Sequence, residues 1–189
     1  MKAASIPAIL RALARVHVLH KPTPLMALWN VTFRCNLRCL YCDARTVSAA
    51  ELSTEEVKSG LDTLWKAGVR WITFGGGEPL IRDDIVELLR YARCKGMSVY
   101  LSTNGLLLNE KADALSYLDF VNVSLDGGQD VHEGIRGGTA FEPALQAARV
   151  CREHGVPVSF LCVLSSRNVE RFDESLAIAE AEGVPIGYQ

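Results

Sequence analysis

Residues 69–95 read VRWITFGGGEPLIRDDIVELLRYARCK, and they contain the structural unit that the rest of the chain repeats. The stretch Val69–Phe74 is rich in β-branched and aromatic residues, which is typical of a strand. Three glycines and Pro79 follow and predict a turn. Apolar residues then recur at helical spacing through 83–95. Because neighbouring parallel strands are joined by such helical crossovers, this unit predicts a parallel sheet.

The same alternation extends in both directions. Strands are expected at Leu25–Thr32, Val69–Phe74, Met97–Ser102, Phe120–Leu125, Val156–Leu164 and Val184–Gln189. Helices are expected at Ser53–Ala67, Asp83–Lys95, Asn109–Leu118, Phe141–His154 and Val169–Glu182. Ser53 and Glu56 form a capping box at the first of these helices. Eight strand–helix units close a barrel. Five units and part of a sixth predict an α/β fold, a partial (βα)6 TIM-like barrel truncated within its sixth strand, and so the front part of a longer protein.

Composition sets the broad class of the protein. The chain has 189 residues, of which 49% are hydrophobic and 22% charged, as expected for one globular domain. A formal net charge of −2 argues against nucleic acid and membrane partners. Six cysteines in a chain long enough to build a core indicate a reducing, cytoplasmic location rather than a disulfide framework. Three scattered cysteines are expected to be small core residues, namely Cys94, Cys151 and Cys162.

The first 22 residues are expected to form a helix and lead-in ahead of a core domain at 23–189. Apolar residues recur there at helical spacing, namely Ile6, Ile9, Leu10, Leu13 and Val16. Arginines interrupt the apolar stretch, which argues against a signal peptide. Packing on the outside of the barrel is favoured, and a membrane surface is the alternative for this basic amphipathic helix.

A second motif lies at residues 35–42, which read CNLRCLYC and have the spacing C-x3-C-x2-C. A structural zinc site takes four ligands, and no fourth ligand lies at a recognisable zinc spacing. A 4Fe–4S cluster has one ligand position per iron, so three thiolates leave one iron open to a small molecule. The motif therefore favours a cluster held by Cys35, Cys39 and Cys42, and the open iron indicates catalysis.

With the aromatic Tyr41 before its last cysteine, this motif resembles the signature of the radical S-adenosylmethionine (SAM) superfamily. The resemblance implies that the open iron chelates the amino and carboxylate groups of SAM, and that Tyr41 belongs to the cofactor-binding residues. An electron from the reduced cluster then splits SAM into methionine and a 5′-deoxyadenosyl radical, which abstracts hydrogen from a substrate. The family uses partial (βα)6 barrels. An external electron donor of the flavodoxin or ferredoxin type is also implied.

The unusual segments all follow the carboxyl ends of predicted strands. The cysteine segment follows the first strand, Gly75–Pro79 the second, Thr103–Gly105 the third and Asp126–Gly128 the fourth. Ligands of parallel α/β folds bind at this end of the sheet. We therefore expect these four loops to converge on one site.

The segment Gly75–Pro79 is suited to close contact with a ligand. Its glycines let the main chain approach closely, and Pro79 holds Glu78 in an extended conformation. The segment resembles the family's Gly-Gly-Glu motif, which binds the methionine amino group of SAM, and Gly76, Gly77 and Glu78 match it. Without the cysteines, a strand-to-helix turn that needs glycine would be the better explanation of these residues.

Short polar side chains stand at the ends of the third and fourth strands, namely Ser102, Asn104, Ser124 and Asp126. The resemblance implies that such residues contact the ribose and carboxylate of SAM. Turn chemistry is the alternative for Asn104 and Asp126, because each precedes a glycine. Arg136 lies in the segment Val131–Gly138, which is expected to be a glycine-rich loop. Its guanidinium is predicted to clamp a carboxylate of SAM or substrate, with a solvated arginine as the alternative. His132 is expected to be structural.

Two branches of the family share further residues with this chain. Ser124–Gly127, Arg136 and Gly137–Phe141 resemble the branch with a C-terminal SPASM or twitch domain, which includes peptide-maturing, quinone-cofactor and haem-modifying enzymes. Gly77–Arg82 and Thr103–Leu106 also resemble the molybdenum cofactor cyclases. The prediction is a radical SAM enzyme for a small-molecule or peptide substrate, with a peptide or cofactor precursor favoured. A cyclase-like enzyme and a non-enzymatic iron–sulfur electron-transfer module are the alternatives. The lack of a basic stripe argues against a tRNA substrate.

Overall fold

The computed structural model of the chain describes residues 10, 14, 16–18, 20 and 22–189. Its six parallel strands form one sheet in the order β1-β2-β3-β4-β5-β6. The strands are β1 (Met26–Thr32), β2 (Trp71–Gly76), β3 (Ser98–Thr103), β4 (Phe120–Ser124), β5 (Val158–Cys162) and β6 (Ile186–Tyr188). The α-helices are α2 (Thr54–Ala67), α3 (Ile85–Cys94), α4 (Gln129–Arg136), α5 (Phe141–Glu153) and α6 (Phe172–Glu182). Short 3-10 helices lie at η2 (Ala44–Thr46), η3 (Pro79–Ile81), η4 (Ala112–Tyr117) and η5 (Val169–Arg171).

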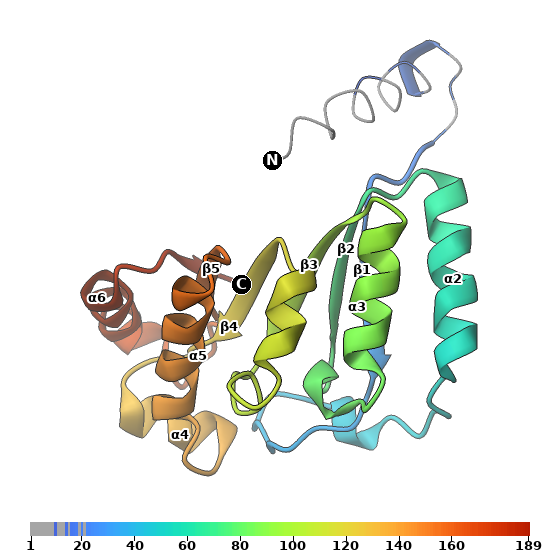
Figure 1. Cartoon of the computed structure of the whole chain (residues 1–189). Helices are drawn as coiled ribbons and strands as arrows, with labels where there is room; N and C mark the ends of the chain where they lie inside the picture. Colours follow the sequence, from blue (N-terminus) through green and yellow to red (C-terminus); the bar gives the residue numbers. More distant parts are fainter. Residues whose placement is uncertain (1–9, 11–13, 15, 19, 21) are drawn as a thin grey trace.

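The helices labelled in Figure 1 cover one face of the sheet, and no helix of residues 22–189 covers the other. Along β2, Ile72 and Phe74 are fully buried in the core beneath the helices. Along β1, Trp29 lies against Gly60 of α2, whereas Met26 and Leu28 are each 70% exposed. This alternation follows from the two-residue period of a strand. The predicted α/β class and partial TIM-like barrel are confirmed.

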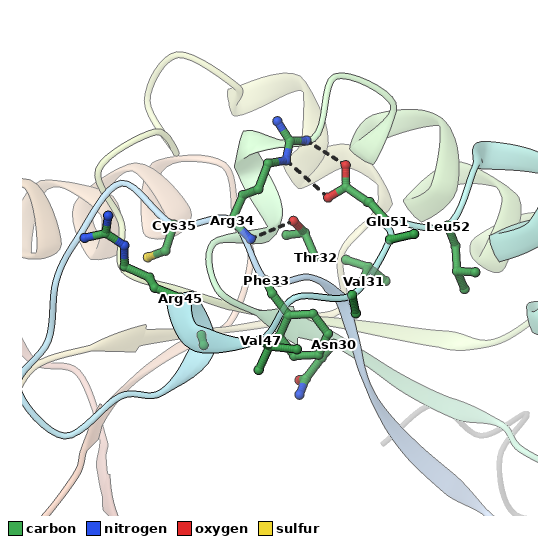
Figure 2. A pocket seen from close by; sticks show the side chains of 13 residues that line it. Asn30, Val31, Thr32, Phe33, Arg34, Cys35, Arg45, Val47, Glu51 and Leu52 are labelled. Carbon is green, nitrogen blue, oxygen red and sulfur yellow. Dashed lines mark hydrogen bonds and ion pairs between the residues drawn. The ribbon is translucent and has the colours of Figure 1, made fainter.

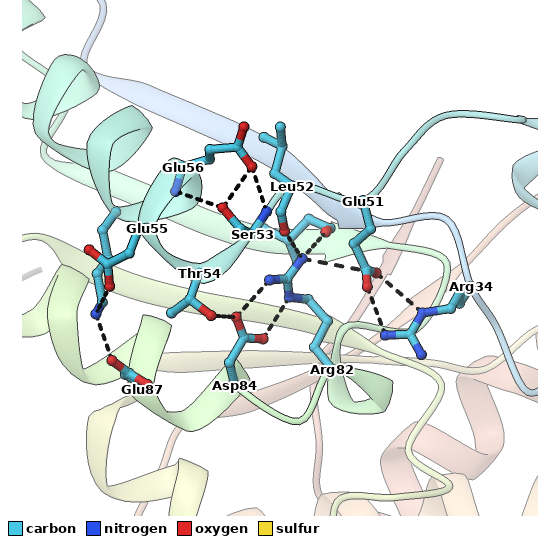
Figure 3. A network of polar contacts seen from close by, with 12 residues as sticks. Arg34, Glu51, Leu52, Ser53, Thr54, Glu55, Glu56, Arg82, Asp84 and Glu87 are labelled. Carbon is cyan, nitrogen blue, oxygen red and sulfur yellow. Dashed lines mark hydrogen bonds and ion pairs between the residues drawn. The ribbon is translucent and has the colours of Figure 1, made fainter.

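The start of α2 is tied to the end of β1 by a polar network (Figure 3). The predicted capping box is present, because the Glu56 N–H donates to Ser53 Oγ (3.4 Å) and the Ser53 N–H donates to Glu56 Oε2 (2.8 Å). The buried Arg82 donates from Nη1 to the carbonyl oxygens of Val31 and Leu52, each at 3.0 Å. Asp84 takes two further hydrogen bonds from the same guanidinium. The network therefore braces the strand end that precedes the cysteine segment.

Two of the predicted elements are wrong. The expected helix Asn109–Leu118 is only the 3-10 helix η4. A 3-10 helix rises about 2.0 Å per residue against 1.5 Å for an α-helix, so it spans the short return to β4 with fewer residues. The expected loop at Val131–Gly138 is largely the helix α4, which ends at Arg136 and is followed by Gly137 with a φ of 79°.

The expectation for the scattered cysteines is confirmed at two positions and wrong at the third. Cys151 and Cys162 are buried, but Cys94 is exposed at the last residue of α3. The buried face of α3 is formed by Ile85, Leu88, Leu89 and Ala92. Cys94 follows Ala92 by two residues, which places it on roughly the opposite side of the helix. Its side chain therefore points away from the core.

The predicted N-terminal helix falls mostly outside the described residues, so the expected boundary at residue 22 stays a prediction. Among the helices of the described part, none is long and apolar enough to cross a membrane.

Candidate cofactor site

A cleft of about 180 Å³ lies at the carboxyl ends of the strands, where the predicted loops converge. It is lined by Cys35, Leu37, Cys39, Tyr41, Cys42, Gly76, Gly77, Ser102, Thr103, Asn104, Ser124, Arg136, Leu161, Val163 and Gln189. The structure thus brings together most of the residues singled out in the sequence. It adds Leu161 and Val163 around the end of β5, whose apolar side chains gave no signal in the sequence beyond their place at the end of a strand.

The three cysteines of the motif lie near one another in the cleft. The Leu37 N–H donates to Cys35 Sγ (3.4 Å), and the Ala44 N–H donates to Cys42 Sγ (3.5 Å). Burial raises the pKa of the Cys35 and Cys39 thiols, and the neighbouring cysteines raise it further. Main-chain N–H groups directed at sulfur favour thiolates that ligate iron, because such hydrogen bonds disperse their charge. Within the described residues, no group of three His, Cys, Asp or Glu side chains is arranged to hold a single metal ion.

The cysteine loop is fastened to the end of α4. The Arg38 N–H donates to the Arg136 carbonyl (3.2 Å), and the Leu40 N–H donates to the Ile135 carbonyl (2.9 Å). The last carbonyl groups of a helix have no partner within the helix, so these bonds satisfy both elements. The loop that carries the thiols is therefore held in place by a helix that follows the fourth strand.

Gly76 and Gly77 pack directly against the backbone that leads into the cysteine loop. The Gly77 N–H donates to the Thr32 carbonyl (2.8 Å), and the Glu78 N–H donates to the Arg34 carbonyl (2.9 Å). Gly76 has a φ of 123°, which disfavours any residue with a side chain. A Cβ atom at position 77 would lie 2.2 Å from the Arg34 carbonyl oxygen. Both glycines are therefore required by the close approach of two loops.

Replacing Gly77 by alanine is expected to destabilise the fold by about 1–3 kcal/mol, because the added methyl group must displace backbone atoms. Urea unfolding measures this change. The matched control is Gly134→Ala within α4, where the new Cβ meets nothing within 4 Å among the described residues. The control is expected to stabilise the helix by about 0.5–1 kcal/mol. Equal effects of the two substitutions would contradict the proposed close approach.

Glu78 lies behind the cleft rather than on its surface. Its carboxylate is fully buried and accepts hydrogen bonds from the main-chain N–H groups of Leu80 and Asn104 and from the Thr103 hydroxyl. The pKa of this carboxyl group lies above its ordinary value, because the effect of burial outweighs that of these hydrogen bonds, which act to lower it. Asn104 in turn donates from Nδ2 to Asn36 Oδ1 (2.7 Å) in the cysteine loop. Glu78 therefore joins the turn after β2 to the turn after β3.

Asp126 also has a fully buried carboxylate and does not line the cleft. It accepts hydrogen bonds from Arg136 Nε (2.7 Å) and Nη2 (3.1 Å), from the Tyr41 hydroxyl (2.9 Å) and from the Val163 N–H (3.0 Å). Arg136 is itself buried, so the solvated-arginine alternative is wrong. One carboxylate thus orients an arginine and a tyrosine that both line the cleft.

His132 is buried and structural, as expected. Its Nδ1 accepts a hydrogen bond from the Asp126 N–H (3.0 Å), and its ring meets the edge of Phe141. Burial and the nearby Arg136 lower the pKa of His132 to about 4. The neutral imidazole is therefore the form that the folded protein accommodates.

The stability of the protein is expected to fall as the pH drops from about 6.5, the unfolded pKa of histidine, toward 4. His132 becomes protonated at a higher pH in the unfolded chain than in the folded protein. The free energy of unfolding therefore decreases by about 3 kcal/mol by pH 4. His132→Asn keeps an acceptor for the Asp126 N–H and should flatten this part of the curve. Urea unfolding across the range measures the difference, and parallel curves for the two proteins would contradict it.

Comparison with known proteins agrees with this site. Residues 29–179 match the model of the Radical SAM superfamily. Fe-coproporphyrin III synthase of Methanosarcina barkeri is 40% identical over 167 residues, which cover 85% of this chain and 42% of that protein. Pre-heme d1 synthase of Dinoroseobacter shibae is 34% identical over 172 residues, covering 86% and 42%. Mycofactocin maturase MftC of Mycobacterium tuberculosis is 35% identical over 170 residues, covering 86% and 44%. The chain therefore spans less than half the length of these relatives.

Solved structures of similar fold include Streptococcus suis SuiB bound to precursor peptide SuiA, with a TM-score of 0.78 and 17% identity over 98% of this chain and 44% of that one. They also include native anSMEcpe with bound AdoMet, with a TM-score of 0.74 and 22% identity over 87% of this chain and 51% of that one. These likenesses concern the fold. The match over residues 29–179, together with relatives from the suspected branch, shows that the chain belongs to the radical SAM superfamily, whose cofactors are a 4Fe–4S cluster and S-adenosylmethionine.

Proposed function

We propose that this chain forms the SAM-cleaving part of an enzyme that abstracts hydrogen from a peptide or a cofactor precursor. One observation carries the proposal. The same cleft is lined by the three cysteine thiols, by the glycines of the Gly-Gly-Glu motif and by polar residues at the ends of β3 and β4. The names of similar proteins support the substrate class, since they include an Fe-coproporphyrin III synthase, a pre-heme d1 synthase, a mycofactocin maturase and a solved structure bound to a precursor peptide.

The residues of the cleft fit both cofactors. Cys35, Cys39 and Cys42 supply three thiolates, the donor set that leaves one iron of a 4Fe–4S cluster open. The bound cluster and SAM together supply an adenosyl radical, which is chemistry that no side chain provides. The protein's task is then to hold, orient and shield these groups.

The remaining residues of the cleft divide that task. Gly76 and Gly77 present main-chain groups without side chains, which suits the amino group of SAM's methionine part. Ser102, Asn104 and Ser124 offer hydroxyl and amide groups for the ribose and the carboxylate. These contacts are our proposal.

Arg136 and Asp126 have different roles at the site. Two nitrogen atoms of the Arg136 guanidinium face Asp126, and no described residue accepts a hydrogen bond from the third, Nη1. We assign Nη1 to a carboxylate of SAM or substrate. Asp126 acts as a positioning residue that holds Arg136 and Tyr41, in place of the direct ribose contact expected from the sequence.

Anaerobic loading of the protein with iron and sulfide, followed by a reductant and SAM, tests the function. The expected products are 5′-deoxyadenosine and methionine. A protein that shows the cluster by electron paramagnetic resonance but forms no 5′-deoxyadenosine would overturn the proposal. A protein that only transfers electrons through its cluster would give this same outcome, a cluster without 5′-deoxyadenosine.

A further inference from the structure

The chain between the last motif cysteine and α2 has few polar contacts with the rest of the fold. We call residues 43–52 the return segment. All of its residues are exposed except the half-buried Ala44. Among the described residues, the hydrogen bonds and ion pairs of residues 43–50 reach no farther than Cys42. The polar attachment of the return segment therefore depends on its last two residues, Glu51 and Leu52.

A cleft of about 460 Å³ lies between the return segment and the end of β1 (Figure 2). Residues 30–35 line it together with residues 44, 45, 47 and 49–52. In Figure 2 the Arg34 guanidinium faces Glu51, which accepts hydrogen bonds from Nε (3.3 Å) and Nη2 (2.8 Å). This pair bridges the cleft, but it is partly exposed, and exposed ion pairs hold weakly.

Arg82 forms a further bridge, and its side chain is buried (Figure 3). Its Nη1 donates to the Val31 carbonyl before the cysteine motif and to the Leu52 carbonyl after it, each at 3.0 Å. Its Nε and Nη2 donate to the two carboxylate oxygens of Asp84, at 2.8 Å and 2.6 Å. Glu51 Oε1 lies 3.9 Å from the same Nη1. One guanidinium thus joins the two ends of the segment that contains all three motif cysteines.

The three motif cysteines do not depend equally on this bridge. Cys35 and Cys39 are half-buried, and the loop around Cys39 is fastened to the end of α4 by main-chain hydrogen bonds. Cys42 is exposed, and its Sγ accepts a hydrogen bond from the N–H of Ala44, which belongs to the return segment. The position of Cys42 is therefore the one most closely coupled to the return segment.

We infer that Arg82 is a positioning residue for the iron–sulfur cluster, because it ties the return segment to the end of β1 and so keeps Cys42 in place as a ligand. The inference rests on the proposed function, which makes Cys42 a ligand of iron. It adds that the cluster is retained through a residue that touches neither the metal nor SAM.

The bridge requires an arginine rather than any cation. A planar guanidinium can present two nitrogen atoms to one carboxylate and still direct a third at other acceptors. Here Asp84 fixes the plane, and Nη1 is left for the carbonyl groups of Val31 and Leu52. A lysine has a single nitrogen, which cannot hold the carboxylate in this way and bond both carbonyls. Arg82→Lys therefore removes the bridge while it keeps the charge.

The test measures how fast the cluster is lost. The protein is loaded anaerobically with iron and sulfide, excess bathophenanthroline disulfonate is added, and the decay of the cluster's visible absorbance gives a first-order rate constant. Arg82→Lys is expected to raise this rate constant by at least about tenfold, as for other residues that support a metal ligand. Glu51→Gln, which weakens the partly exposed bridge, is expected to raise it by about twofold or more.

A second measurement uses the protein without its cluster. The ¹⁵N amide order parameters of residues 43–50 are expected to fall in Arg82→Lys, because the segment is released at one end. Those of residues 37–40 should keep their wild-type values, since this part of the loop is fastened to α4. A general loosening of the fold would lower both sets.

Two controls separate the bridge from overall stability. Arg171→Lys makes the same exchange at an exposed ion pair with Asp130, and it should leave the rate constant and the order parameters unchanged. Leu145→Ala removes a buried side chain from α5, which packs on β4 and β5. It should lower the stability toward urea and leave the rate of cluster loss near that of the wild type.

Three results would overturn the inference. They are a wild-type rate of cluster loss in Arg82→Lys, an equal increase in Leu145→Ala, and unchanged order parameters in residues 43–50. Should Arg82→Lys not fold, Glu51→Gln decides by the same two measurements. A wild-type protein that takes up no cluster would instead contradict the proposed function, and the order parameters would still show whether Arg82 ties the return segment.

Discussion

Cys39→Ala is expected to abolish both cluster loading and SAM cleavage. Cys39 lies between the other two motif cysteines and shares the cleft with both. With two thiolates left, a second iron loses its protein ligand and the cluster is no longer anchored on three corners. Loss of a neighbour that merely supports a metal ligand commonly costs 10–100-fold, so loss of the ligand itself should exceed about 100-fold. Iron and sulfide analysis, electron paramagnetic resonance and 5′-deoxyadenosine formation measure the result.

The matched control is Cys94→Ala. Cys94 is exposed at the end of α3 and lies outside the cleft, so its loss should leave iron content and activity unchanged. If Cys39→Ala kept a full 4Fe–4S cluster, or if Cys94→Ala lost one, the assignment of the three ligands would be wrong.

Asp126→Asn is expected to destabilise the protein by about 3–5 kcal/mol, because it leaves a buried arginine without its counter-ion. Arg136 Nε and the Tyr41 hydroxyl both donate to Asp126 Oδ2, and an asparagine that keeps Oδ1 in place puts an NH₂ group before these two donors. Urea unfolding at constant pH measures the stability. The affinity for SAM should fall as well, since both displaced side chains line the cleft.

Asp130→Asn is the matched control, in the first turn of α4, the helix that carries Arg136. Asp130 pairs with Arg171 at 2.9 Å, but both side chains are exposed, and such pairs contribute about 0–1 kcal/mol. If the two substitutions cost the same, Asp126 would have no special place in the site. A loss of stability without a change in SAM affinity would confine Asp126 to a structural role.

Much of this site was predictable because its residues belong to short local motifs. The spacing of the cysteines, the run Gly75–Pro79 and the polar residues after β3 and β4 are each visible within a few positions. The alternation of strands and helices then places all of them at one end of the sheet, since parallel strands share their direction.

The long-range pairings were not predictable in the same way. Asp126 looked like a ribose ligand or a turn residue, whereas its carboxylate meets Tyr41, which lies 85 positions earlier. Arg136 was expected to clamp a carboxylate from a glycine-rich loop, with a solvated side chain as the alternative, but α4 forms there and the side chain is buried against Asp126. Tertiary contacts of this kind outweigh local propensity. Cys94 was misjudged because helical spacing fixes a buried face only once the register of α3 is known.

The accessible face of the sheet has a consequence for how such proteins diversify. Side chains such as Met26 and Leu28 project from it, remote from the cofactor end, and contribute little to the core. Substitutions at exposed positions usually change stability by less than about 0.5 kcal/mol. A lineage can therefore remodel this face by single point changes while the radical-generating end stays the same.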